Sequence, residues 1–285
     1  MNIILFHKNC MDGSGAAWAA WSYFRNNSKF IGVQYDKPMP HFNAGDDLYI
    51  LDFSYSPEAI IEAAQKAHTI TLIDHHQSAQ KEHEQYWASH DIPENVKISF
   101  DLNHSGCVLA WQYFFPDKPV PELLSIIEDH DLWSFKYPST KAIMCALHNK
   151  TPFKIQNLHK LYGNTSLKNI EKMGDLLLEQ RNGSIKRLLV KKHPIQLGGF
   201  KGLAVNAPPE FSNEVGHALA HESNTFGTTY QYDGDTQRWW FAIRSTGNYD
   251  VSEVAKQYGG GGHKNAAGFS LDQDHFETLF QNRTA

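Results

Sequence analysis

Residues 69–76 read TITLIDHH, an apolar run followed directly by an aspartate and two histidines. The apolar part is short and rich in β-branched residues, which predicts a buried strand rather than a helix. Three further runs of this kind each end at a polar residue. They are residues 2–6 (NIILF), which end at His7, residues 47–51 (DLYIL), which end at Asp52, and residues 96–100 (VKISF), which end at Asp101.

Sequences typical of helices separate these strands. Residues 16–24 are rich in Ala and Trp, and Ser56 followed by Pro57 has the composition of a helix start. Two further helices are expected at residues 105–115 and 121–128. This alternation of strands and helices predicts an α/β fold with a doubly wound, mainly parallel sheet.

Ligands of such sheets bind beyond the carboxyl ends of the strands. The expected strands therefore bring His7, Asp52 and the triplet at residues 74–76 to one edge, with Asp12 close by. A lone aspartate here more often caps a helix, and a lone histidine more often lies on the surface or in the core. Crowded carboxylates repel one another unless cations are bound, and mixed carboxylate and imidazole ligands suit Mn, Fe or Zn. The combination favours a metal site.

The second half of the chain has a different pattern. Residues 166–192 are polar with leucines on one side, which predicts a connecting helix. Short strands are expected after it near residues 203–205, 228–232 and 239–244, with helices near 211–221 and 250–258. This pattern indicates a smaller α+β domain. We therefore expect a catalytic domain at residues 1–150, a helical linker at 151–192 and a substrate-binding domain at 193–285.

Composition narrows the function further. The net charge of −5 over 285 residues argues against a protein that coats long nucleic acids, whose affinity comes from many lysines and arginines. Three scattered cysteines suit a reducing cytoplasm, and neither a signal peptide nor an apolar run long enough to span a membrane is recognisable. We expect a cytoplasmic protein that does not associate with membranes. Its oligomeric state is left open, a homodimer included.

Five motifs in order resemble the DHH/DHHA1 phosphoesterase family, which includes exonucleases of short oligoribonucleotides and phosphodiesterases of cyclic dinucleotides. They are HKNCMDG at residues 7–13, LD at 51–52, DHH at 74–76, EDHD at 128–131 and GGGGHKNAAG at 259–268. The resemblance implies a DHH domain followed by a DHHA1-type domain. It also implies Mn²⁺ as the cofactor, as one or two ions, with Mg²⁺, Fe²⁺ or Co²⁺ as alternatives.

The resemblance also implies roles for individual residues. The expected metal ligands are His7, Asp12, Asp52, His75 and Asp129, with Asp52 bridging two ions. His76 is expected to contact the scissile phosphate, and Asp74 to orient an imidazole. Asp131 is an alternative to Asp129.

One departure from the family concerns the first motif, which usually carries a histidine and two aspartates. Here only Asp12 is present, and Asn9 and Cys10 stand near the position of the missing carboxylate. Asn offers a neutral oxygen and Cys a soft thiolate. We therefore expect one metal position to be weaker, changed in its metal preference or only partly filled.

The glycine-rich motif is expected to bind phosphate. Gly260, Gly261 and Gly262 allow successive N–H groups to converge on an anion, and His263 adds a donor. Arg244 resembles the family's arginine that holds substrate on the C-terminal domain, through a bidentate guanidinium–phosphate contact. The aromatic residues Trp239, Trp240 and Tyr249 are more simply core residues than base-stacking ones.

The function expected from these observations is hydrolysis of very short single-stranded RNA or DNA to mononucleotides by a metal-dependent 3′–5′ phosphodiesterase. Dinucleotides, such as the linear products of cyclic-dinucleotide breakdown, are included. A nucleotide phosphomonoesterase and a cyclic-dinucleotide phosphodiesterase are the alternatives within the enzyme class. A catalytically silent nucleotide sensor is the alternative outside it, favoured only by the missing carboxylate.

Overall fold

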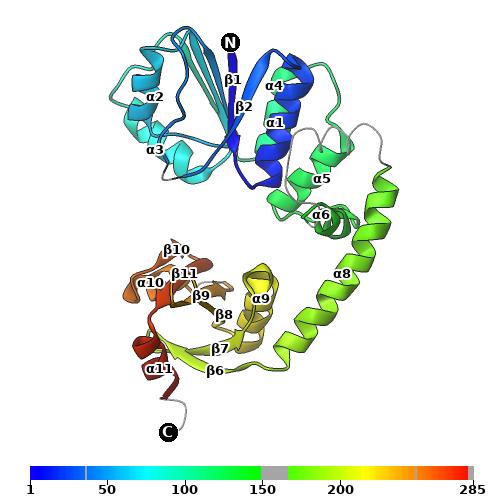
Figure 1. Cartoon of the computed structure of the whole chain (residues 1–285), viewed down its shortest axis with the longest axis vertical. Coiled ribbons are helices and arrows are strands. Elements are labelled where there is room, and N and C mark those ends of the chain that lie inside the picture. Colours follow the sequence, from blue (N-terminus) through cyan, green and yellow to red (C-terminus); the bar gives the residue numbers. More distant parts are fainter. Residues whose placement is uncertain (36, 149–165, 248, 282–285) are drawn as a thin grey trace. The chain divides into compact units, whose positions relative to one another are not determined.

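The computed structural model describes residues 1–35, 37–148, 166–247 and 249–281 (Figure 1). The chain divides into two compact units, Met1–Leu178 and Glu179–Ala285. The division falls inside the long helix α8 (Leu167–Leu189), within the stretch expected as a linker. Residues 151–165 of that stretch lie outside the described residues.

The N-terminal unit is built on a sheet of five parallel strands in the order β2-β1-β3-β4-β5. The strands are β1 (Asn2–His7), β2 (Ser28–Val33), β3 (Asp47–Leu51), β4 (Thr69–Asp74) and β5 (Val96–Phe100). The chain moves from β1 to one neighbour, β2, and then to the other, β3, so the order reverses at β1. Such a switch point is where ligands bind in open α/β sheets.

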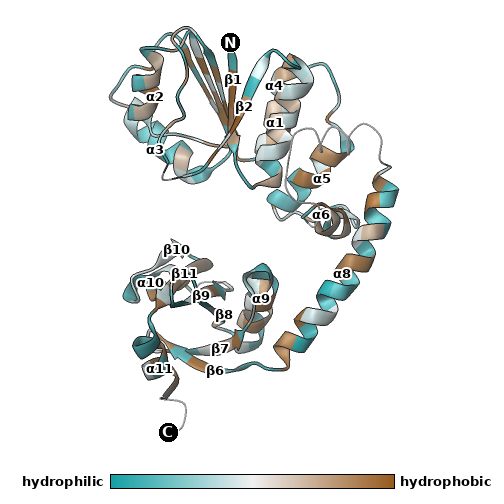
Figure 2. Cartoon of the chain, in the orientation of Figure 1, coloured by the Kyte–Doolittle hydropathy of each residue, from teal (hydrophilic) through white to brown (hydrophobic). Residues whose placement is uncertain are grey.

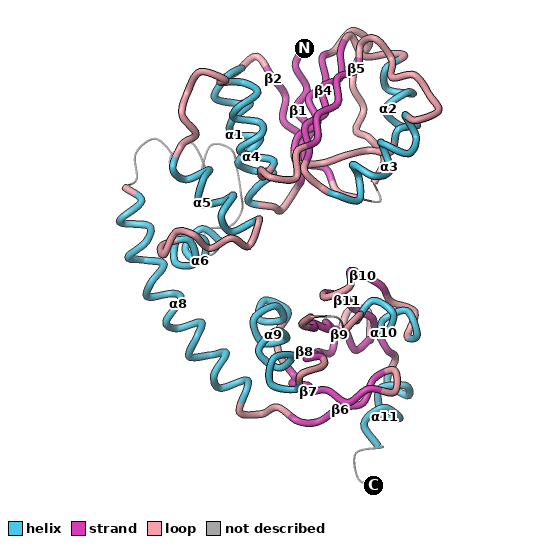
Figure 3. Tube along the Cα trace, turned by 180° about the vertical axis from the view of Figure 1, so that it is seen from behind, coloured by secondary structure: helices cyan, strands magenta, loops and turns pink. Residues whose placement is uncertain are grey.

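Helices cover both faces of this sheet, as expected from the α/β pattern (Figures 1 and 3). Helices α1 (Met11–Phe24) and α4 (Gly106–Phe114) lie on one side, and α2 (Pro57–Ala64) and α3 (Gln77–Trp87) lie on the other. Two separate cores result: the α1–α4 side also includes α5 (Glu122–Asp131) and α6 (Thr140–His148). Figure 2 shows that the strands between the two layers are largely apolar, which is typical of a parallel sheet buried on both faces.

Three elements of this unit were not predicted, namely β2, α3 and α6. The edge strand β2 is mostly half-exposed, so it lacks the continuous apolar run that marked the other strands. Helix α3 buries only Ala79 and His83, so its sequence QSAQKEHEQYW carries almost no apolar periodicity.

The C-terminal unit contains a mixed six-stranded sheet in the order β10-β11-β9-β8-β7-β6. The strands are β6 (His193–Leu197), β7 (Phe200–Asn206), β8 (Phe226–Asp233), β9 (Arg238–Ser245), β10 (Gly261–His263) and β11 (Ala266–Leu271). Only β7 and β8 pair in parallel. The helices are α9 (Ser212–Ser223), α10 (Val251–Gln257) and α11 (Gln273–Gln281), with a 3₁₀ turn at Pro209–Phe211. The expected α/β domain followed by a smaller α+β domain is confirmed.

The three cysteines, all within the described residues, are free thiols. In the described part of the chain, no helix combines the length and the apolar character needed to cross a membrane.

Candidate metal centre

The carboxyl ends of three adjacent strands meet at one edge of the N-terminal sheet. His7 is the last residue of β1, Asp52 follows β3, and Asp74 ends β4 directly before His75 and His76. Because β1, β3 and β4 are neighbours in the sheet, these side chains come together from segments that are far apart in the sequence. The structure thus brings together the histidines and aspartates expected from the strand ends.

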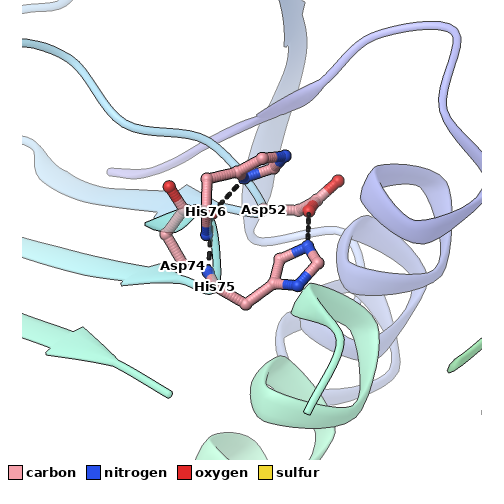
Figure 4. Close-up of side chains that lie close together, drawn as sticks. All are labelled: Asp52, Asp74, His75 and His76. Atoms are coloured by element: carbon pink, nitrogen blue, oxygen red, sulfur yellow. Dashed lines mark hydrogen bonds and ion pairs between the residues drawn. The ribbon is translucent and has the colours of Figure 1, made fainter. Parts of the chain in front are cut away.

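Asp52 lies at the centre of this edge, as Figure 4 shows. Its side chain is 1% exposed, and its oxygens face two different imidazoles. Oδ1 lies 3.2 Å from Nε2 of His75, and Oδ2 lies 3.6 Å from Nδ1 of His7. The Asp52 backbone has a φ of 53°, a left-handed conformation that residues with a side chain rarely adopt and that often marks functional sites. A carboxylate placed between two imidazoles in this way can bridge two cations.

Three overlapping groups of side chains could each hold a metal ion. Within each group, ligand atoms lie within 4.8 Å of one another. The groups are His7, Cys10 and Asp52; Asp12, His75 and Asp131; and Asp52, Asp74, His75 and His76.

Two buried atoms in the first group support a cation rather than a protein network. Neither Nδ1 of His7 nor Oδ2 of Asp52 has a hydrogen-bond partner. Buried polar atoms are nearly always paired, because an unpaired one costs free energy. Nitrogen and oxygen donors left without a partner and facing each other are what a divalent cation requires. The residues present therefore fit a metal centre.

Asp12 is held by the start of helix α4. The backbone N–H groups of Gly106 and Cys107 donate to its two oxygens, at 2.6 and 2.9 Å. This approach requires a glycine at position 106, since a Cβ there would lie 2.5 Å from the Cβ of Asp52. Gly13 plays the same part beside β1, where a Cβ would lie 2.3 Å from the carbonyl oxygen of His7.

The acidic groups perturb one another strongly. Burial raises the pKa of Asp12 well above its ordinary range, and the charges of Asp52 and Asp131 raise it further. Burial also raises the pKa of Asp131. Burial alone would lower the pKa of His75, but its hydrogen bond to Asp52 and the neighbouring carboxylates raise it to about 9. Protons here partly neutralise a cluster of negative charge that divalent cations would neutralise when bound.

Asp74 is placed to position His76 rather than to bind metal directly. Its Oδ1 lies 2.7 Å from Nδ1 of His76 and accepts the backbone N–H of His75, while Oδ2 accepts the hydroxyl of Ser54 at 2.6 Å. Since Nδ1 of His76 is engaged, Nε2 is the ring nitrogen that remains for a ligand. Burial would lower the pKa of His76, but the bond to Asp74 raises it, which favours an imidazole that can donate to a phosphate oxygen.

Asp129, one of the expected metal ligands, is engaged by the protein itself. Its carboxylate accepts hydrogen bonds from the backbone N–H groups of Lys136 and Tyr137 and from the hydroxyl of Thr140, so its oxygens hold the following loop. These bonds, acting against burial, lower the pKa of Asp129. The structure places Asp131 in the cluster instead, with Oδ2 3.6 Å from Nε2 of His75.

Two supporting interactions were missed by sequence reasoning. Glu128 accepts the backbone N–H of Ser105 and contacts Nδ1 of His104, which fixes the turn before α4. Ser105 stands at the N-cap position of α4, but its side chain makes no capping bond there. The sequence signal for this role of Glu128 was its place as the first residue of the EDHD motif.

The expected substrate-binding residues lie together on the C-terminal sheet. His263 pairs with Ala266, and Ala266 pairs with Arg244, so the three form one row across β10, β11 and β9. Paired residues of adjacent strands point to the same face, which places Arg244 and His263 on one face about 10 Å apart. The guanidinium of Arg244 is held by Oδ1 of Asn213, at 3.0 Å from Nε and 2.6 Å from Nη2. Gly260, Gly261 and Gly262 lead into this row, and Gly262 has a φ of 143°.

Comparisons with known proteins agree with this arrangement. Residues 212–282 match the family model of the DHHA1 domain. The chain is 27% identical over 292 residues to uncharacterized protein R106 of Acanthamoeba polyphaga mimivirus, an alignment that covers 95% of this chain and 68% of that relative. It is 22% identical over 255 residues to oligoribonuclease NrnB of Bacillus subtilis, covering 82% of this chain and 62% of that relative.

A solved structure shares the fold. The pGpG-specific phosphodiesterase PggH from Vibrio cholerae matches with a TM-score of 0.60 and 14% identity, covering 99% of this chain and 96% of that one. The DHHA1 match, the oligoribonuclease relative and the shared fold support the resemblance to DHH/DHHA1 phosphoesterases that the sequence motifs indicated.

Proposed function

We propose that this chain is a divalent-metal-dependent phosphodiesterase that hydrolyses very short oligonucleotides, linear dinucleotides included, to mononucleotides. The observation that carries the proposal is Asp52, whose two oxygens face separate imidazoles at the edge of the sheet. The names of two relatives, an oligoribonuclease and a pGpG-specific phosphodiesterase, support short oligonucleotides as the substrate class.

The proposed ligands are Asp12, His75 and Asp131 in one group and His7 in the other, with Asp52 shared between them. When bound, divalent cations lower the pKa of a water and neutralise charge on a phosphate. Mn²⁺ suits the group of Asp12, His75 and Asp131, which offers only nitrogen and oxygen; Mg²⁺, Fe²⁺ and Co²⁺ are the alternatives. Asp131 replaces Asp129 in this assignment.

The remaining residues bind and orient the substrate. His76, held by Asp74, donates from Nε2 to a non-bridging oxygen of the scissile phosphate, where charge develops during attack. Arg244 and His263 bind substrate phosphate through charge-assisted hydrogen bonds, and the glycines beside them let backbone N–H groups approach. Because Asn213 fixes the guanidinium, little rotamer freedom is lost on binding.

Substrate range tests this proposal. The purified chain would be incubated with Mn²⁺ and a panel of linear di- to pentanucleotides, cyclic dinucleotides and nucleotide phosphomonoesters, with products identified by mass spectrometry. We expect mononucleotides from the linear substrates, with the dinucleotide cleaved fastest, and no products from Asp52→Ala or in excess chelator. Preferential turnover of cyclic dinucleotides or phosphomonoesters would contradict the proposed substrate class. Tight binding of nucleotide without turnover would indicate a sensor.

Two expectations stay predictions. One is the cytoplasmic location inferred from the scattered cysteines, and the other is that the protein does not coat long nucleic acids.

A further inference from the structure

Cys10, like Asn9, stands near the position at which the family's first motif usually carries a second carboxylate. It is the N-cap residue of α1, and its backbone is extended, with φ −113° and ψ 141°. Its carbonyl oxygen accepts both the N–H and the hydroxyl of Ser14, at 3.1 and 2.7 Å, so the start of the helix fixes the position of the residue. The thiol is therefore presented by a rigid element and not by a free loop.

The surroundings of this thiol indicate a ligand and not a packing role. Sγ of Cys10 lies within 4.8 Å of a ring nitrogen of His7 and a carboxylate oxygen of Asp52. Nδ1 of His7 and Oδ2 of Asp52 are both buried and have no hydrogen-bond partner. Asp52 is 1% exposed, so water cannot readily satisfy that oxygen. Sulfur, nitrogen and oxygen donors thus converge, two of them without a protein partner.

We propose that the Cys10 thiolate binds a metal ion directly, together with His7 and Asp52, and that this group selects a thiophilic divalent cation such as Zn²⁺, Fe²⁺ or Co²⁺. A thiolate favours these ions over Mg²⁺, Ca²⁺ and Mn²⁺, which prefer oxygen. The group of Asp12, His75 and Asp131 has no sulfur, so the two positions that share Asp52 have different preferences. The inference rests on the metal-dependent function proposed above.

The chemistry of binding is simple. As the sulfur–metal bond forms, the thiol proton leaves to solvent, and neither sulfur nor metal changes oxidation state. The side chain is partly exposed, so an ion can reach it. A bound thiolate carries the same charge as a carboxylate and is the softer ligand.

Cobalt absorption tests the inference without relying on activity. The metal-free full chain would be titrated with Co²⁺ while the near-ultraviolet thiolate-to-cobalt charge-transfer band is recorded. We expect the band in the unmodified chain and in Cys145→Ser, a control whose thiol lies on α6 outside the three groups. Cys10→Ser and Cys10→Asp should lose it. Cys10→Asp should also shift the Zn²⁺-over-Mn²⁺ preference by at least roughly tenfold toward Mn²⁺, the lower end of what a lost metal contact costs.

A second measurement uses only the unmodified chain, in case a variant does not fold. Stoichiometric Zn²⁺ should protect Cys10 from alkylation by iodoacetamide, as read by peptide mass spectrometry, whereas Mn²⁺ should not. Cobalt binding without the charge-transfer band, or equal protection by both ions, would overturn the inference. Oligonucleotide hydrolysis without the band would leave the proposed function standing and remove only the thiolate ligand. The band without hydrolysis of any phosphoester would do the reverse.

Discussion

The carboxyl edge of the N-terminal sheet and the row across β9, β11 and β10 both gather charged residues, but they differ in how their polar atoms are satisfied. At the first, Asp12 and Asp52 are 1% exposed and two buried atoms have no protein partner. At the second, the guanidinium of Arg244 donates two hydrogen bonds to Asn213 and one to the backbone carbonyl of Ile243, and β10 is exposed along its length. The first region is suited to bound cations, whereas the second suits reversible binding of a phosphate.

Removing the shared carboxylate should have the largest effect. Asp52→Asn weakens the contact with both metal groups, so we expect kcat/KM to fall by at least about a thousandfold and bound metal to decrease. Asp101→Asn is the matched control, because Asp101 also follows a strand of this sheet but its side chain accepts hydrogen bonds from Asn103 and belongs to none of the three metal groups. Metal content by mass spectrometry and rates on a dinucleotide would measure both. Equal losses of activity and metal in the two variants would contradict a special role for Asp52 among the aspartates that follow the strands.

The two aspartates at the end of α5 should separate activity from stability. Asp131→Asn is expected to lower kcat/KM by about a hundredfold and weaken metal binding, with little loss of stability because it relieves repulsion. Asp129→Asn should leave the metal content of the protein unchanged but lower the free energy of unfolding by about 1–3 kcal/mol, since it weakens the side-chain bonds that hold residues 136–140. Urea unfolding and metal analysis would distinguish them. Loss of metal from Asp129→Asn, together with loss of stability but not of metal from Asp131→Asn, would indicate that Asp129 is the ligand.

Arg244→Ala should lower kcat/KM less than the substitutions above and should leave the amount of bound metal unchanged. Loss of a charge-assisted contact predicts a fall in kcat/KM of roughly ten- to a hundredfold. Arg238→Ala is the control, because Arg238 lies on the same face of β9 but is bonded to Ser270. Steady-state kinetics on a dinucleotide would show the difference. If Arg244→Ala lost metal, the separation of the two regions would be wrong.

The smallest expected effect is on pH dependence. His75 has its pKa raised from 6.5 to about 9, so the folded protein holds this proton more tightly than the unfolded chain does. The stability this contributes is complete below pH 6.5 and lost as pH rises through 9. Metal displaces the proton, so the difference in Tm between metal-loaded and metal-free protein should grow over this range by about 2–5 °C. Thermal scans would show it, and a constant difference would contradict the assignment of His75.

The strand ends were predictable because buried parallel strands leave an unmistakable apolar run. Two expected strands, residues 47–51 and 96–100, match the structure residue for residue, and the polar residue after each lies at the edge. The family motifs then indicated which of the residues at this edge are expected to bind metal or contact substrate. The row formed by Arg244 and His263 could not be predicted, because it depends on the register of two strand pairs that no local pattern sets.

The choice between Asp129 and Asp131 was beyond the sequence for a geometric reason. Two residues apart on a helix, side chains point about 200° away from each other, so only one of them can face the cluster. Both are acidic, and the motif EDHD does not say which faces inward. The loop after α5 distinguishes the two aspartates in the structure, because its backbone N–H groups donate to the carboxylate of Asp129.

The glycine at position 106 gives this molecule an unusual pattern of mutational tolerance. Any side chain there would collide with Asp52, and the collision would push apart the start of α4 and the end of β3. Such substitutions leave every proposed ligand in place in the sequence, so a list of ligand residues would not flag them. Position 106 thus acts as a spacer, and a chain that had lost it could retain the whole signature of the family while no longer being an enzyme.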